Sequence, residues 1–90
     1  MDHTETYNRA IKEFGLDPQI DMCIEEMSEL TKALIKHRRD PKELNRCKIA
    51  EEIADVQHTL DQMKLIFSSN DEQDIWMNLK IVKLERKLMM

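Results

Sequence analysis

The chain has 90 residues with one Gly, two Pro and a formal net charge of −4. This length allows one small domain, residues 1–90, and a lone chain of this size buries only about two thirds of its surface. We therefore expect a homo-oligomer, either a homodimer or a dimer of dimers. The acidic balance argues against a nucleic-acid partner, and a hydrophobic content of 41% argues against wholesale disorder.

Helical periodicity dominates the chain, and no segment alternates as a strand would. The predicted helices cover residues 4–14, 17–39, 41–67 and 71–88. The first ends at Gly15, a residue typical of helix C-termini. Asp17-Pro18 reads as an N-cap followed by Pro at the first helical position, and Asp40-Pro41 repeats that signal. Ser69 or Asn70 is expected to cap the last helix. Short connections between four helices predict an all-α four-helix bundle.

Apolar residues spaced by three and four define the expected core. On the second and third helices they are Cys23, Met27, Leu30 and Leu34, and Ile49, Ile53, Val56, Leu60, Met63 and Phe67. The fourth helix is apolar on two nearly opposite faces, which are Ile75, Leu79, Val82 and Met89, and Met77, Ile81, Leu84 and Leu88. A chain this short cannot bury both faces, so we expect part of this helix to pack against another subunit.

Four carboxylates flank these seams on two helices that should be antiparallel neighbours. They are Glu26, Glu29, Glu52 and Asp55. A solvated, salt-bridged surface would place Lys or Arg three or four residues from each acid. Only Lys32 after Glu29 and Lys48 before Glu52 meet that demand. Converging carboxylates without basic partners favour a hard divalent cation, Mg²⁺ or Mn²⁺, although the salt-bridged surface remains an alternative.

A di-iron carboxylate bundle is a weaker alternative. That class of site uses Glu-x-x-His on two helices, whereas this chain has one related motif, Asp55-x-x-His58. His3 and His37 are expected to be exposed to solvent, and Cys23 and Cys47 to be small packing residues.

No secretory signal peptide and no apolar run near 18 residues is visible in the sequence. We therefore expect no membrane partner and a cytoplasmic location with reduced thiols.

The motif Glu25-Glu26-x-x-Glu29 followed by Glu52-x-x-Asp55 resembles the EExxE…ExxD signature of the MazG-like all-α nucleoside triphosphate pyrophosphohydrolases. This superfamily also contains dimeric dUTPases, dCTP pyrophosphatases and phosphoribosyl-ATP pyrophosphohydrolases. The segments "KEFGLDPQIDMCIEEMSEL" and "EEIADVQHTLDQMKLIF" are similar to the family's leading segment and its metal-bearing third helix. The similarity covers residues 4–88.

The resemblance implies a MazG-like bundle that hydrolyses the bond between the α- and β-phosphates of a nucleoside triphosphate. It implies that the four carboxylates named above are the Mg²⁺ ligands. Glu25 would be an accessory acid that orients the attacking water, either beside the metal ligands or as a ligand of a further metal ion.

Four more residues are candidates for substrate binding. Gln19 lies where the family's leading segment approaches the nucleotide, and Lys36 follows Glu29 by two turns on nearly the same face. Lys48 could contact a phosphate or pair with Glu52, and Lys83 could close the site of its own or a neighbouring subunit. The competing hypothesis is a non-catalytic nucleotide-binding or oligomerisation module that retains the fold. Retention of all four ligand-type acids argues against that module.

Overall fold

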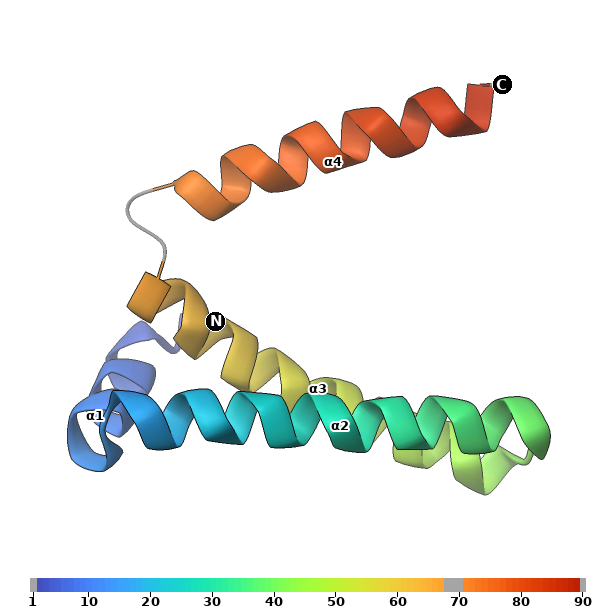
Figure 1. Cartoon of the computed structure of the whole chain (residues 1–90), viewed down its shortest axis with the longest axis horizontal. Coiled ribbons are helices and arrows are strands. Elements are labelled where there is room, and N and C mark those ends of the chain that lie inside the picture. The colour runs from blue at the N-terminus through green and yellow to red at the C-terminus, as the bar shows by residue number, and fades with distance from the viewer. Residues whose placement is uncertain (1, 68–70, 90) are drawn as a thin grey trace.

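The computed structural model describes residues 2–67 and 71–89 and contains four α-helices, coloured from blue to red in Figure 1. They are α1 (Thr4–Phe14), α2 (Leu16–Arg39), α3 (Glu43–Phe67) and α4 (Glu72–Met89). Within the described residues there is no strand, so the all-α class is confirmed. The predicted cap at Ser69 or Asn70 lies outside the described residues. None of the described helices combines the length and apolar character needed to cross a membrane.

Gly15 joins α1 to α2 in a single residue. Its backbone has φ 93° and ψ 164°, a conformation that is essentially restricted to Gly. Its N–H donates to the carbonyl of Ile11 at 2.8 Å, which completes the end of α1. Helix α2 then begins at Leu16, so the prediction that Asp17 is the N-cap is wrong. Pro18 fits inside the first turn because N–H groups there have no intrahelical acceptor.

Asp40 ends α2 and does not start α3, contrary to the sequence prediction. Its N–H donates to the carbonyl of Lys36 at 3.0 Å. Its own carbonyl accepts a hydrogen bond of 2.7 Å from Asn45 Nδ2. Helix α3 therefore begins at Glu43, two residues after Pro41, and Asn45 ties its first turn to the end of α2.

Helices α2 and α3 pack side by side and antiparallel, and α1 packs against both (Figure 1). The Tyr7 hydroxyl of α1 and His58 Nδ1 of α3 share a hydrogen bond of 2.8 Å. Gln19 Nε2 of α2 donates to the carbonyl of Ala10 at 3.4 Å. Together these bonds orient α1 across the α2–α3 pair.

Helix α4 stands apart from the other three in Figure 1. Its first turn is linked to α3 by an ion pair of 3.8 Å between Asp74 and Lys64. Beyond that region α4 has no extended packing against the other described helices. The described helices therefore form a three-helix unit with a projecting fourth helix, so the predicted four-helix bundle does not close within one chain.

The contact between α2 and α3 is largely polar, which the expected core did not anticipate. The buried side chains of the described residues are Gln19, Cys23, Asn45, Glu52, Val56, Thr59 and Gln62. Of the predicted seams, Cys23 and Val56 are buried, but Met27, Leu34, Ile53, Leu60 and Phe67 are exposed. The two helices meet mainly through the sector beside the seams, where the buried polar side chains lie. Most of the residues in each apolar stripe are consequently exposed or half-buried, and Cys23 and Val56 are the buried members.

Candidate metal centre

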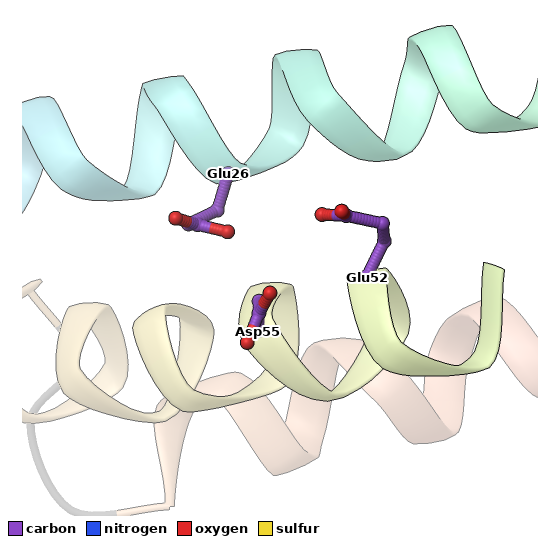
Figure 2. Close-up of side chains that lie close together, drawn as sticks. All are labelled: Glu26, Glu52 and Asp55. Atoms are coloured by element: carbon purple, nitrogen blue, oxygen red, sulfur yellow. The ribbon is translucent and has the colours of Figure 1, made fainter. Parts of the chain in front are cut away.

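Three carboxylates from two helices meet in the middle of the α2–α3 contact. Glu26, Glu52 and Asp55 each offer one oxygen, and these oxygens lie within 4.8 Å of one another. Figure 2 shows Glu26 reaching from α2 toward the other two side chains on α3. The i,i+3 spacing of Glu52 and Asp55 puts both on one face of α3. Three of the four predicted ligands thus converge.

The cluster is only partly open to solvent. Glu52 is 5% exposed, whereas Glu26 and Asp55 are half-buried. Loss of hydration raises the pKa of Glu26 above its ordinary value, and the charges of Asp55 and Glu52 raise it further. The ionised form of Glu26 is therefore destabilised, and binding of either a proton or a cation would reduce this destabilisation.

Lys48 supplies the positive charge at one edge of the cluster. Its Nζ lies 3.1 Å from a carboxylate oxygen of Glu52 and 3.7 Å from one of Glu51. The hydrogen bond to Glu52, with the charge of Glu51, raises the pKa of Lys48. The ion pair that the spacing allowed is confirmed. One ammonium faces three carboxylates, so the negative charge of the cluster is only partly balanced.

Glu29 and Glu25 lie outside this convergence. Glu29 is exposed, and one of its oxygens lies 3.7 Å from Lys32 Nζ. Three residues after Glu26, it is turned about 60° around α2. Glu25 is also exposed. Their roles as a metal ligand and a water-orienting acid stay predictions.

The candidate substrate residues lie in different surroundings. Gln19 is 3% exposed and engaged with the carbonyl of Ala10, a link between α1 and α2 that the sequence did not reveal. Lys36 is exposed near the end of α2, and Lys83 is exposed on the projecting helix. Lys48 alone of the four has an ion pair with the cluster in the described part of the chain. Their contacts with substrate stay predictions.

Of the two histidines that bear on the sequence predictions, only His37 differs from its expectation. His58 is bonded to Tyr7 and lies outside the carboxylate group, which leaves Asp55-x-x-His58 without a shared site. His37 was expected to be exposed, but it is half-buried, and its Nδ1 has no hydrogen-bond partner among the described residues.

Replacing Glu26 with Gln should stabilise the metal-free protein at neutral pH, because an amide removes one of the three repelling charges. An unfolded Glu titrates near 4.5, whereas folded Glu26 titrates at a higher pH. Between those values the folded state binds more protons, so the contribution of Glu26 to stability falls as pH rises. The difference in unfolding free energy between the variant and the parent should therefore grow from pH 4.5 upward. Urea denaturation in EDTA at fixed protein concentration measures it.

Glu13→Gln is the matched control, since it changes net charge equally at an exposed position on α1. It should leave stability within about 0.5 kcal/mol of the parent. A Glu26→Gln protein less stable than the parent in EDTA at neutral pH would contradict the repulsion argument.

Comparisons of the chain with protein-family models, with curated proteins and with solved structures found no match. Assignment to the MazG-like superfamily is therefore a proposal, supported by the motif residues and by the convergence of three of its acids.

Proposed function

We propose that this chain is a Mg²⁺-dependent nucleoside triphosphate pyrophosphohydrolase of the MazG-like type. It would cleave the α–β phosphate bond of ribo- or deoxyribonucleoside triphosphates and release a nucleoside monophosphate and pyrophosphate. Removal of noncanonical nucleotides would be its physiological role, in the cytoplasm. The observation that carries the proposal is the meeting of Glu26, Glu52 and Asp55 between α2 and α3.

The donor set fits a hard divalent cation. All the converging ligand atoms are carboxylate oxygens, and no His or Cys belongs to the group. Such oxygens suit Mg²⁺ or Mn²⁺, and Mg²⁺ held by few carboxylates leaves positions for phosphate oxygens. The raised pKa of Glu26 fits as well, because a group that resists ionisation next to other acids is relieved by a cation.

Glu26, Glu52 and Asp55 would hold the ion, with Glu29 reaching it by a change of side-chain rotamer. Glu29 is free to do so because its ion pair with Lys32 is exposed and long, at 3.7 Å. A Mg²⁺ ion bound there would supply Lewis-acid neutralisation of the polyphosphate charge. The carboxylates would thus position the substrate through its phosphates.

The remaining residues would act on the substrate and water. Glu25, one residue before Glu26, would orient a water molecule and accept its proton as the water oxygen attacks the α-phosphorus. The bond from that phosphorus to the bridging oxygen breaks, and pyrophosphate leaves. Lys48 could exchange its contact with Glu52 for one with a phosphate oxygen, because it is half exposed and long. Lys36, Lys83 and Gln19 are the further candidates for substrate contact, and no covalent intermediate is required.

The test is pyrophosphate release from a panel of standard and modified nucleoside triphosphates, with Mg²⁺, with Mn²⁺ and with EDTA. Release should require the metal and should yield the monophosphate in equal amount. If no triphosphate gives metal-dependent release while isothermal calorimetry detects nucleotide binding, the chain is the non-catalytic module. If neither release nor binding is found, both the pyrophosphohydrolase and the nucleotide-binding module are wrong.

A further inference from the structure

Both apolar faces of α4 are open to solvent. The four residues of one face, Met77, Ile81, Leu84 and Leu88, are between 47% and 77% exposed. Cys23 and Val56 are the hydrophobic side chains that are buried in the described part of the chain. Exposed apolar surface on this scale marks an interaction site.

The exposed area matches what a second copy would cover. The chain exposes 7730 Å² at a mass of 10.7 kDa. A compact monomer of that mass exposes about 5,500 Å², so the excess is roughly 2,200 Å². Two copies covering this excess would bury roughly 4,400 Å² in total, within the range of obligate homodimers.

A groove adjoins the start of that face. It is lined by Leu60, Met63 and Phe67 of α3 and by Trp76 and Met77 of α4, and it holds about 570 Å³. Met77 belongs both to the groove and to the exposed face of α4. The groove and the face therefore form one continuous apolar surface.

Charge along α4 indicates how a second α4 would lie. Glu72 and Asp74 are in its first turn, and Arg86 and Lys87 are in its last turn. Two such helices packed antiparallel point the acidic start of each toward the basic end of the other. A parallel arrangement would place like charges together at both ends.

We propose that a second copy of this chain packs its α4 antiparallel against α4, with Met77 opposite Leu88 and Ile81 opposite Leu84. The spacing of these four residues by four, three and four is symmetric about the point midway between Ile81 and Leu84, so both pairs form twice around one two-fold axis. Leu88 of each copy then enters the groove of the other, beside Trp76. This assembly stands independently of the proposed catalytic function.

The first experiment measures mass by analytical ultracentrifugation and follows the emission of Trp76, the single Trp of the chain. The parent should sediment as a dimer, and its emission should shift to longer wavelength on dilution as Trp76, 57% exposed in one chain, loses its cover. Leu84→Glu should raise the dissociation constant at least about 100-fold. Asn78→Glu, which adds the same charge at a polar position of α4, should remain dimeric.

The second experiment fixes the orientation. In a Cys47→Ser background, the Met77→Cys and Leu88→Cys proteins are mixed and oxidised. Antiparallel packing predicts a disulfide between the two different variants and little within either variant alone. Disulfides within each variant alone would overturn the antiparallel arrangement, and a monomeric parent at high micromolar concentration would overturn the dimer altogether, whatever the variants do.

Discussion

Asp55→Asn should lower Mg²⁺-dependent pyrophosphate release by about 1,000-fold while the helical circular dichroism stays unchanged. An amide loses the negative charge that the cation needs, and interactions of a metal with the reacting phosphates are worth several kcal/mol in the transition state. The fold should survive, because the same change removes a charge that repels Glu26 and Glu52. Steady-state pyrophosphate release and far-ultraviolet circular dichroism measure the two effects.

Glu25→Gln is the companion variant that separates binding from chemistry. It should lower turnover by about 100-fold or more, as expected for loss of a general base, yet keep metal binding because Glu25 lies outside the carboxylate group.

Wild-type turnover in Asp55→Asn would show that the metal assignment is wrong. Unfolding of that variant in EDTA would instead make Asp55 a structural residue.

Mg²⁺ should raise the melting temperature of the parent by roughly 10–20 °C. A ligand that binds only the folded state at about 100 times its dissociation constant stabilises it by about 2.7 kcal/mol. Each kcal/mol shifts the melting temperature of a domain of this size by about 4–8 °C. The cation also removes the repulsion within the cluster, where Glu52 is almost fully buried. Differential scanning calorimetry with and without EDTA measures the shift.

Two variants test whether the shift in melting temperature arises from Mg²⁺ bound at the carboxylate cluster. Glu52→Gln should lose most of it, whereas Glu13→Gln should keep all of it, since Glu13 is exposed on α1. An equal shift in the parent and in Glu52→Gln would mean that Mg²⁺ acts through general screening of the net charge and not at the cluster.

The helices could be predicted from the sequence almost to the residue. Helix α1 has the expected bounds, and the starts of the other three differ from expectation by one or two residues. Start and stop signals are local, so they can be read without knowing the tertiary partner. Even so, the Asp17-Pro18 pattern predicted the wrong N-cap for α2. The N-cap is Gly15, and the only sequence signal for its Gly-specific backbone conformation is the Gly itself.

The faces that meet could not be predicted in the same way. An apolar seam such as Ile53, Leu60 and Phe67 indicates that something covers it, but not whether that cover belongs to the same chain. Thr59 and Gln62 share a sector with Glu52, and this polar stripe was the one signal that the contact with α2 would be polar. Three acids converge as spacing alone suggested, whereas the orientation of Glu29 depends on how α2 rotates against α3.

The two sides of α3 carry separate properties, because Glu52 and Asp55 point toward α2 (Figure 2), whereas Ile53, Leu60 and Phe67 are exposed. In the proposed dimer, substitutions at Leu60, which lines the groove beside α4, would change how copies associate while Glu52 and Asp55 stay intact. Substitutions on the acidic side can change ion preference without touching the outer surface. The proposed assembly and the proposed chemistry would thereby depend on different residues, so substitution could change either one while the other is kept.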